Sequence, residues 1–375
     1  MNGNAMFGVV TIFYALILFI FGHFIAPDPS AHAANQINEL TFKKPGFTIQ
    51  LLHQPLERAP VKTGFLEYLI YGKKSNVRYI PIHSYRFIKD SLYVDRYLGD
   101  GVGEQIGFKL DEIGVPQNKS IIENQKIIEK KYIETKRFYF GTDDLGRDYL
   151  SRIIIGTRVS LAVGFVAVII ALFIGIPLGA IAGFYKKLPF AFKFSGRKLK
   201  INPDDMIMWF MNVIWSIPAL LLVFPIVFAF GQQFYTIFIA VGLTMWVDIA
   251  RIVRGQVLQV REMEYIQATK SFGFSDFRTI LKHILPNIMG PVIVITAANF
   301  AYAILTEAGL SFLGIGVQPP APSWGLMISK YKDNLITDPY LTFFPGIAIT
   351  LLVLAFFMIG NGIRDALDVK TQIEN

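Results

Sequence analysis

The sequence predicts an all-α polytopic membrane protein with six transmembrane helices and a mixed α/β extracytoplasmic insertion between helices 1 and 2. Its mean hydropathy of +0.44 and its 53% hydrophobic residues are too high for a soluble domain. Six segments supply the roughly 20 apolar residues needed to cross a bilayer core of about 30 Å. The long stretch over residues 27–140, in contrast, has the composition of a soluble region.

The six spans are expected at residues 6–26, 159–185, 206–230, 234–252, 288–308 and 341–363. Such boundaries carry an error of a few residues. The third and fourth spans are separated only by Gly231-Gln232-Gln233, which predicts a helical hairpin.

The positions of the positive charges set the orientation. Basic residues fill the loops after spans two and four, namely Lys186, Lys187, Lys193, Arg197, Lys198 and Lys200, then Arg251, Arg254, Arg261, Lys270, Arg278 and Lys282. Loops rich in Lys and Arg stay in the cytoplasm. With six spans, both termini are then expected in the cytoplasm. The net charge of +8 follows from this orientation and does not indicate nucleic-acid binding.

The first apolar run allows a second interpretation. Ala31-His32-Ala33 resembles the cleavage site of a signal peptide. However, neither Lys nor Arg precedes the run, and the run is longer than a typical signal core. An uncleaved first span is favoured, and cleavage would leave the other five spans unchanged.

The insertion mixes strand-type and helix-type patterns. Residues 47–52 and 79–82 are typical of short strands, and Ser120 with Glu123 predicts a capping box that opens a helix toward Thr135. It contains no catalytic or metal-ligand cluster. Because the chain has no cysteine, disulfides and cysteine-based metal sites are excluded. An elaborated loop without its own chemistry is expected.

A run of glycine and charged residues precedes the second span: Gly141-Thr142-Asp143-Asp144-Leu145-Gly146-Arg147-Asp148, followed by Ser151-Arg152. It is typical of an amphipathic approach to the membrane, and one interpretation is an interfacial helix whose arginines contact lipid headgroups. The spacing of the carboxylates does not indicate a cation site.

Two features lie within the spans. Gly175, Gly179 and Gly183 form a stripe of small residues where another helix can approach closely, in this chain or in a second one. Asp248 and Glu307 are the ionisable residues that stand out, and such carboxylates can mark ion pathways. A structural role is favoured for both, with Asp248 pairing with Arg251 or Arg254.

The cytoplasmic segment between spans four and five is more elaborate than a connector requires. Small residues at Ala268 and Thr269 suit a helix that contacts another protein, and Gly273 permits a sharp exit from that helix. Phe272 and Phe274 are expected to anchor it, in a partner's cleft or in the loop's own base. Pro286 is expected to restart the chain as span five begins. The alternative is a basic helix lying on anionic lipid.

Several ordered motifs together carry a family resemblance. They are Ile25-Ala26-Pro27 with Pro29, the 140–148 motif with Ser151-Arg152, residues 308–316, Gln318-Pro319-Pro320, Ser323-Trp324-Gly325, Phe344-Pro345-Gly346 and residues 364–368. The chain resembles the integral membrane permease subunit of ATP-binding-cassette importers, in the oligopeptide/dipeptide branch. The resemblance covers the first span and most of residues 140–368, and it points to the second of the two permeases that pair in such importers.

Permeases of this family carry a cytoplasmic Glu-Ala-Ala, three residues, Gly, then Ile-x-Leu-Pro pattern. Here the corresponding residues are Gln267-Ala268-Thr269, Gly273, His283 and Leu285-Pro286. The usual acidic residue is absent, although Glu264 lies one turn earlier. The resemblance implies that residues 261–286 couple to an ATPase through Glu264, Tyr265, Gln267, Ala268, Thr269, Gly273, Phe274, Leu285 and Pro286.

The resemblance also implies a domain division. Residues 1–26 form the first helix, 27–140 the insertion, 141–368 the permease domain and 369–375 a cytoplasmic tail. The expected partners are a homologous permease in a heterodimer, two ATPases, an extracytoplasmic solute-binding protein, membrane lipids and a peptide substrate, without nucleic acid.

No cofactor is expected in this chain, and ATP and Mg are expected on the ATPases. The chain has no phosphate-binding Gly-x-x-x-x-Gly-Lys-Ser/Thr loop, so a non-catalytic subunit of the cytoplasmic membrane is expected.

Other functions remain open at this point. Related permeases carry nickel, glutathione or peptide antibiotics. A secondary transporter or channel would couple ions through Asp248 or Glu307, but the sequence shows neither inverted repeats nor a filter motif. An intramembrane protease would need His-Glu-x-x-His, which is absent. A sensor would bind a ligand in the insertion and signal through the helices.

Overall fold

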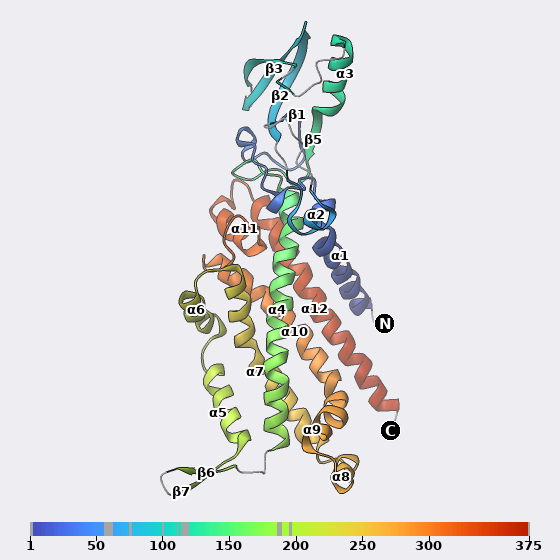
Figure 1. The fold of residues 1–375 in the computed structure, drawn as a ribbon, viewed down its shortest axis with the longest axis vertical. Helices are drawn as coiled ribbons and strands as arrows, with labels where there is room; N and C mark the ends of the chain where they lie inside the picture. Colours follow the sequence, from blue (N-terminus) through green and yellow to red (C-terminus); the bar gives the residue numbers. More distant parts are fainter. Residues whose placement is uncertain are drawn as a thin grey trace.

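The computed structural model describes residues 3–55, 63–74, 77–99, 101–110, 112–113, 120–185, 190–194 and 197–373. The molecule is elongated, with a bundle of helices and a small β-sheet at one end (Figure 1). We call this the sheet end. The opposite end carries the short helix α8 (Glu264–Ser271) and is called the α8 end.

Among the described residues, five helices are long and apolar enough to cross a membrane, judged by length and composition. They lie within α1 (Gly3–Ile25), α4 (Tyr149–Phe184), α7 (Phe234–Val260), the α9–α10 region and α12 (Tyr340–Ile373). A sixth crossing exists only if α5 (Pro203–Trp215) and α6 (Ala219–Phe230), which are bent by 89°, count as one span.

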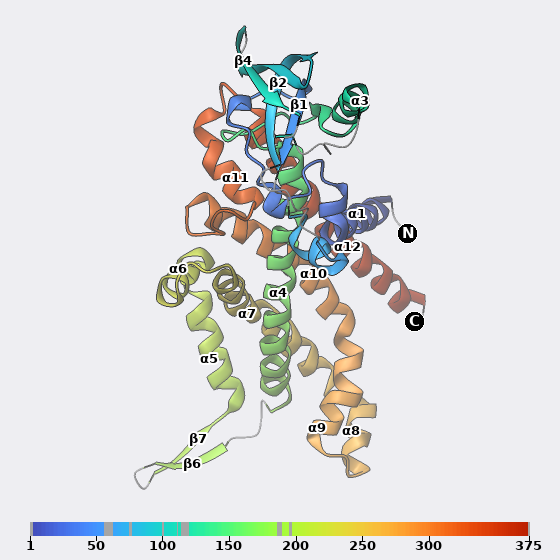
Figure 2. The same ribbon diagram turned by 45° about the horizontal axis from the view of Figure 1, so that its top comes forward.

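The third predicted span, over 206–230, is therefore not one straight helix but two helices with a bend between them. The break falls at Ser216-Ile217-Pro218. Proline lacks an N–H group and disfavours helical backbone in the residue before it, which explains the interruption at Ile217. Figure 2 shows α6 turned away from the direction of α5.

The fifth span is longer than predicted. Helix runs from Asp276 to Phe312 through α9 (Asp276–Thr279), a π-helical stretch (Ile280–Ile284) and α10 (Leu285–Phe312). Pro286 therefore does not restart the chain, because the chain is already helical ten residues earlier. The wider π turn is a known way to absorb an irregularity in a helix, and here it ends two residues before the proline.

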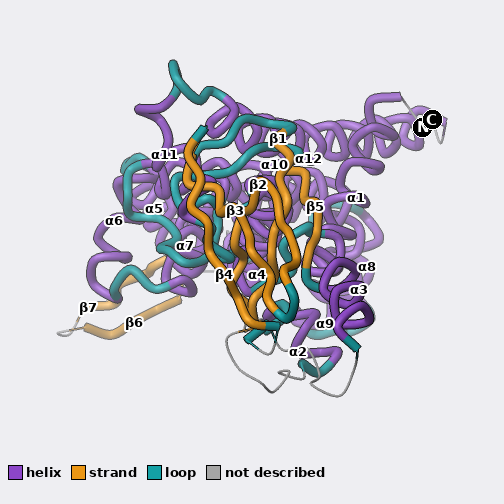
Figure 3. The backbone as a smooth tube through the Cα atoms, turned by 90° about the horizontal axis from the view of Figure 1, so that it is seen from above, coloured by secondary structure: helices purple, strands orange, loops and turns teal. Residues whose placement is uncertain are grey.

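The insertion between α1 and α4 contains a five-stranded antiparallel sheet with strand order β4-β3-β2-β1-β5. The strands are β1 (Phe47–Pro55), β2 (Val77–Ile88), β3 (Ser91–Gly99), β4 (Val102–Lys109) and β5 (Ile133–Phe138). Helix α3 (Ile121–Lys131) contributes Ile128 to a core that includes Leu52 and Ile80. Figure 3 shows the sheet from above, over the helices.

The predicted strands at 47–52 and 79–82 are confirmed. Ser120 caps α3 as predicted, and its side chain accepts a hydrogen bond from the Glu123 N–H at 3.3 Å. The helix ends at Lys131, short of Thr135, because the following residues form β5 and pair with β1.

Short elements complete the described part of the chain. They are α2 (Phe65–Tyr71), α11 (Trp324–Tyr331), the hairpin β6 (Phe190–Phe194) and β7 (Arg197–Ile201), and 3₁₀ turns at Ala31–Ala33, Asn38–Leu40 and Lys332–Asn334. The hairpin lies in the basic loop between α4 and α5, of which Lys186 and Lys187 are outside the described residues.

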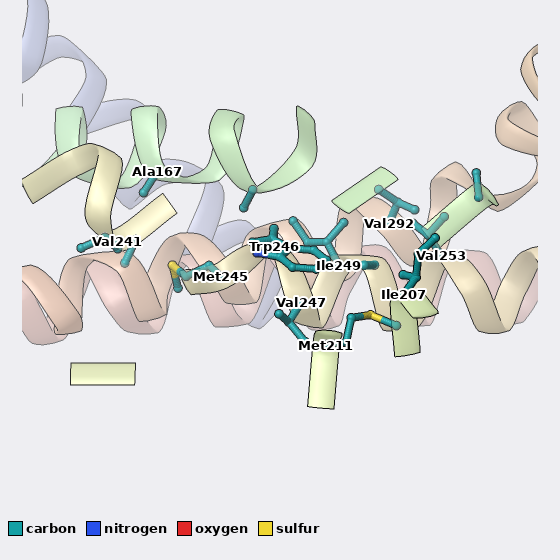
Figure 4. Close-up of a cluster of buried hydrophobic side chains, with 14 of the residues drawn as sticks. Ala167, Ile207, Met211, Val241, Met245, Trp246, Val247, Ile249, Val253 and Val292 are labelled. Atoms are coloured by element: carbon teal, nitrogen blue, oxygen red, sulfur yellow. The ribbon is translucent and has the colours of Figure 1, made fainter. Parts of the chain in front are cut away.

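The largest hydrophobic core joins α4, α5, α7 and α10. Figure 4 shows Met245, Trp246 and Ile249 of α7 within it, together with Met211 of α5 and Val292 of α10. This core fixes the position of α7, and the candidate site follows directly from the end of that helix.

Candidate functional site

Helix α8 lies at the tip of the α8 end and follows α7 after a short turn. Glu264, Tyr265 and Gln267 are exposed, whereas Ile266 is fully buried. The helix therefore presents a polar and aromatic face to the outside while an isoleucine holds it to the bundle.

Thr269 is placed differently from the expectation. It is 5% exposed, and its hydroxyl donates a hydrogen bond to the Ile266 carbonyl at 2.7 Å and lies 3.2 Å from the Thr279 hydroxyl. The side chain therefore joins α8 to α9 within the chain. Of the two small residues, Ala268 is partly accessible, whereas Thr269 is turned inward.

Gly273 ends α8 in a left-handed conformation, with φ of +74°. The Phe272 N–H bonds to the Ala268 carbonyl and the Phe274 N–H bonds to the Thr269 carbonyl, each at 3.0 Å. A Cβ at this glycine would meet nothing within 4 Å. The requirement for glycine is therefore conformational.

Phe274 lies between two side chains of the next helix. Its ring stacks on His283 with centroids 5.6 Å apart, and the Arg278 guanidinium lies 4.1 Å above it. His283 occupies the position where the related pattern has isoleucine, and it packs as an aromatic partner. Phe274 thus anchors the segment in its own base, whereas Phe272 is 76% exposed.

Leu285 and Pro286 lie where this base meets the long helices. Pro286 is exposed. Leu285 lines an apolar groove of about 570 Å³ between α4 and the Asp276–Phe312 helix, with Phe173, Pro177, Phe277 and Leu281 among the other lining residues.

Two arginines of the basic loop after the fourth predicted span connect the segment to the bundle. Arg261 donates hydrogen bonds to the carbonyls of Gly183 and Phe184 at 3.1 and 2.9 Å, at the last turn of α4. Arg254 pairs with Asp204 of α5. Of the two partners predicted for Asp248, Arg254 is therefore taken by Asp204, and the charge of Arg251 is the one that acts on Asp248. The 50-residue separation of Arg254 and Asp204 gave no signal in the sequence.

Asp248 belongs to a polar cluster at the bend between α5 and α6. It contacts the Trp215 side chain, and Arg251 lies 4.3 Å over the Trp215 ring. Arg251 also donates to the Asn212 side-chain oxygen at 3.2 Å. The cluster joins α7 to the last turn of α5.

The three glycines of α4 face α7 of the same chain. A Cβ added at Gly175, Gly179 or Gly183 would lie 2.8, 2.4 or 2.8 Å from a backbone carbonyl oxygen of α7. Those oxygens belong to Trp246, Ala250 and Arg254. The stripe thus brings two backbones together within one chain.

Glu307 is 1% exposed on α10 and accepts a hydrogen bond from the Ser311 hydroxyl at 2.7 Å. The Ser323 side chain also contacts it, and the Ser323 hydroxyl lies 3.4 Å from that of Ser311. The carboxyl group therefore ties α10 to the residue that caps α11.

The charged run before α4 is buried, which contradicts the interpretation that its arginines contact headgroups. Arg147 and Arg152 are 7% and 5% exposed, and their Nε atoms lie 2.7 and 3.6 Å from an oxygen of Asp143. Asp148 caps α4 by accepting from the Ser151 N–H at 2.8 Å.

The neighbouring Asp144 connects this run to α11. Burial disfavours its charged form, but hydrogen bonds from Lys330 and Tyr331, at 2.8 and 2.6 Å, outweigh this effect. They hold the pKa of the Asp144 carboxyl below its ordinary value of 3.8. Among the described residues, no cluster of three or more His, Cys, Asp or Glu could hold a metal ion.

Residues 175–373 match the family described as the binding-protein-dependent transport system inner membrane component. The chain belongs to this family. It is accordingly a multi-pass permease subunit of ATP-binding-cassette transport and not an enzyme, since the ATPase of such transporters is a separate subunit.

Curated relatives agree with this membership. The chain is 39% identical over 236 residues to the oligopeptide transport system permease protein OppC of Bacillus subtilis (strain 168), covering 63% of this chain and 73% of that protein. It is 42% identical to the dipeptide permease DppC of Alkalihalophilus pseudofirmus and 37% identical to the glutathione permease GsiD of Pectobacterium atrosepticum, covering 62% of this chain and 72% of each relative.

A solved structure of the MetNI methionine ABC transporter in an inward-facing conformation superposes with a TM-score of 0.44 and 18% identity, covering 57% of this chain and 95% of that chain.

Proposed function

We propose that this permease forms, with a homologous permease, the translocation path of an ATP-driven peptide importer. Two ATPase subunits, which bind ATP and Mg, dock at the α8 end, and an extracytoplasmic solute-binding protein delivers peptide at the sheet end. The proposed membrane domain is 141–368, preceded by the first helix at 1–26 and followed by a cytoplasmic tail at 369–375. Both termini are cytoplasmic in this arrangement, and α5 with α6 supplies the sixth span.

The observation that carries this proposal is the way α8 is held. The helix exposes Glu264, Tyr265 and Gln267 at the tip of the molecule. Its two ends are nevertheless fixed, because Arg261 before it bonds to the end of α4 and Thr269 within it contacts α9. A helix that lay loosely on lipid would need no such attachments. Rigid attachment is what transmits movement from a docked ATPase to the spans.

The outward face differs from the related pattern in one respect. Gln267 stands in the usual acidic position, and Glu264 is the exposed carboxylate of the helix. Glu264, Tyr265, Gln267 and Ala268 are accordingly the proposed ATPase contacts. Thr269 and Phe274 hold the segment from within, Gly273 sets the backbone conformation at the end of α8, and Leu285 and Pro286 lie where the segment joins the long helices.

Cysteine cross-linking tests the docking directly, because the chain contains no cysteine of its own. Tyr265→Cys and Gln267→Cys should each cross-link to the ATPase in the assembled transporter, and Val102→Cys at the sheet end should not. Co-purification of the ATPase should be lost on Gly273→Arg and on deletion of residues 268–274. Full association and uptake in both of those variants would refute the docking proposal.

The substrate class is tested by uptake in a deletion strain complemented with this chain. Labelled di-, tri- and oligopeptides are expected to accumulate, in line with the peptide permeases among the relatives. Glutathione is the second candidate, because GsiD is 37% identical. Nickel and peptide antibiotics complete the panel, and uptake of one of these in place of peptides would replace the substrate class while leaving the importer intact.

The insertion at 27–140 is proposed as a dock or lid for the solute-binding protein. Its sheet stands above the bundle at the sheet end, where that protein would arrive (Figure 1). Deletion of residues 40–130 should weaken both the affinity for the binding protein and transport. Unchanged values of both quantities would show that the insertion has another role.

A further inference from the structure

Helix α2, inside the insertion, has a surface that its own sheet does not cover. Phe65, Leu66, Ile70 and Tyr71 are 68%, 68%, 52% and 68% exposed. At about 100° per residue, Phe65, Leu66, Leu69 and Ile70 fall within an arc of about 140°. Glu67 lies outside this arc and pairs with Lys74 at 2.6 Å. The side of the short helix that carries these four residues is therefore apolar, and Phe65, Leu66 and Ile70 on it are exposed, while Tyr71 is exposed beyond the arc, beside Glu67.

The position of α2 is fixed by contacts to two membrane-spanning helices. The Tyr68 ring lies 4.3 Å from the Phe24 ring of α1, and its hydroxyl donates to the His23 carbonyl at 3.2 Å. Arg158 of α4 donates to the Ile70 carbonyl at 2.9 Å. These contacts hold α2 beside the bundle and below the sheet, as Figures 1 and 2 both show.

The close approach depends on the residue that ends α2. Gly72 has φ of +83°, and a Cβ there would lie 2.7 Å from the Pro29 carbonyl oxygen and 2.9 Å from His23 Nδ1. Only glycine allows the chain to pass α1 at this distance. The helix is thus held rigidly at one depth.

That depth coincides with a membrane boundary on both supporting helices. Phe24 is the penultimate residue of α1, which ends at Ile25. Arg158 immediately precedes the part of α4 that carries no charged residue, which runs from Val159 to Phe184. A helix level with both points lies where hydrocarbon meets the headgroups.

The exposed apolar side of α2 continues the exposed side of α1. Phe21, Phe24 and Ile25 are 44%, 42% and 45% exposed, and Phe65 packs against Phe24 with ring centroids 5.8 Å apart. Aromatic residues concentrate at such boundaries, and lysines such as the exposed Lys74 suit the adjacent phosphate layer. A contiguous apolar surface of this kind marks an interaction site.

We propose that α2 is an interfacial anchor, which inserts Phe65, Leu66, Leu69 and Ile70 into the lipid leaflet at the sheet end. It would hold the base of the insertion at a fixed height on the membrane. The occupant is the acyl and glycerol region of phospholipid, not a protein partner. The proposal depends on the membrane assignment of α1 and α4 and is independent of the transported substrate.

Site-directed spin labelling tests the depth of α2, again because the chain has no native cysteine. Leu66→Cys and Ile70→Cys are labelled with a nitroxide in the assembled transporter, reconstituted in liposomes. Collision rates are measured with oxygen, which partitions into lipid, and with the nickel complex NiEDDA, which stays in water. Glu67→Cys is the matched control on the polar side of the same helix, with Phe13→Cys in α1 and Val102→Cys in the sheet as references.

At positions 66 and 70, the ratio of the oxygen collision rate to the NiEDDA collision rate should be several-fold higher than at positions 67 and 102. It should approach the ratio at position 13. Equal access of both reagents to positions 66 and 70 would place the helix in water and overturn the proposal. Protection from both reagents would mean that a protein partner covers α2, which also overturns it. Because all three α2 sites are partly or largely exposed, the labels should not unfold the protein.

Discussion

The Arg254 guanidinium of α7 donates two hydrogen bonds to the Asp204 carboxylate of α5. One runs from Nε to Oδ1 at 2.5 Å and the other from a terminal nitrogen to Oδ2 at 2.7 Å. The Asp204 side chain is only 5% exposed. Two-pronged pairs of this kind are the strongest and most directional ion pairs in proteins. The pair holds the first turn of α5 against α7, about two helix turns before the candidate coupling segment at 261–286.

Removal of one partner should therefore be costly. Asp204→Ala leaves a guanidinium without its partner, and Arg254→Ala leaves a nearly buried carboxylate without its partner. Each should lower the free energy of unfolding by about 2–4 kcal/mol. Thermal unfolding in detergent, run as a double-mutant cycle, measures the coupling between them. If the two losses simply added, the pair would contribute no interaction energy.

The glycine stripe of α4 should tolerate no side chain. Gly179→Leu places a side chain where even a Cβ would lie 2.4 Å from the Ala250 carbonyl oxygen. Separating two packed helices in this way should cost about 1–3 kcal/mol or more. Gly255→Ala on α7 is the control, because nothing lies within 4 Å of its Cβ position, and it should be neutral or slightly stabilising. Unfolding temperatures of both variants provide the comparison.

Gly273 offers a test that separates conformation from contact. Its positive φ is costly for a β-branched residue and tolerated by asparagine, while the space around it is open. Gly273→Val should therefore lose ATPase co-purification and coupled uptake, and Gly273→Asn should retain most of both. Equal losses in the two variants would mean that an added side chain collides with the docked partner, and that the backbone conformation is not the cause.

The pH dependence of stability should reveal the link between Asp144 and α11. Because the pKa of Asp144 lies below 3.8 in the folded protein, the carboxylate stabilises the fold at pH values above 3.8. This contribution is lost as the pH falls below 3.8 through the folded-state pKa. Lys330→Met should lower the free energy of unfolding near neutral pH. The variant should then lose less of this free energy than the parent chain when the pH is lowered. Unfolding curves between about pH 7 and pH 3 compare the variant with the parent chain.

The sequence predicted the elements that depend on local pattern. Long apolar runs located the spans, and the spacing of Ser120 and Glu123 located the start of α3, because both signals lie within a few residues of one another. The predicted end of α3 was wrong, because the pairing of β5 with β1 overrides helix propensity after Lys131. The break before Pro218 could have been read from the proline itself.

The contacts that build the candidate site were less accessible. Thr269 was expected to face outward because it is small, but its direction depends on where Thr279 returns after the turn at Gly273. The bonds from Arg261 to the end of α4 join residues more than 70 positions apart, and a single sequence carries no sign of such a pairing. Long-range partners follow from the packing of helices, and local pattern does not reveal them.

Helix α4 runs without interruption from Tyr149 to Phe184, which at 1.5 Å per residue is about 54 Å. Its first turn is capped by Asp148 beneath the sheet, and its last carbonyls are held by Arg261 beside α8. One continuous helix, which contains Pro177, thus connects the sheet end to the α8 end. A tilt imposed at one end of α4 arrives at its other end as a displacement of comparable size, without passing through a loop. In the proposed importer, a movement at the ATPase side would therefore reach the side of the solute-binding protein through a single helix.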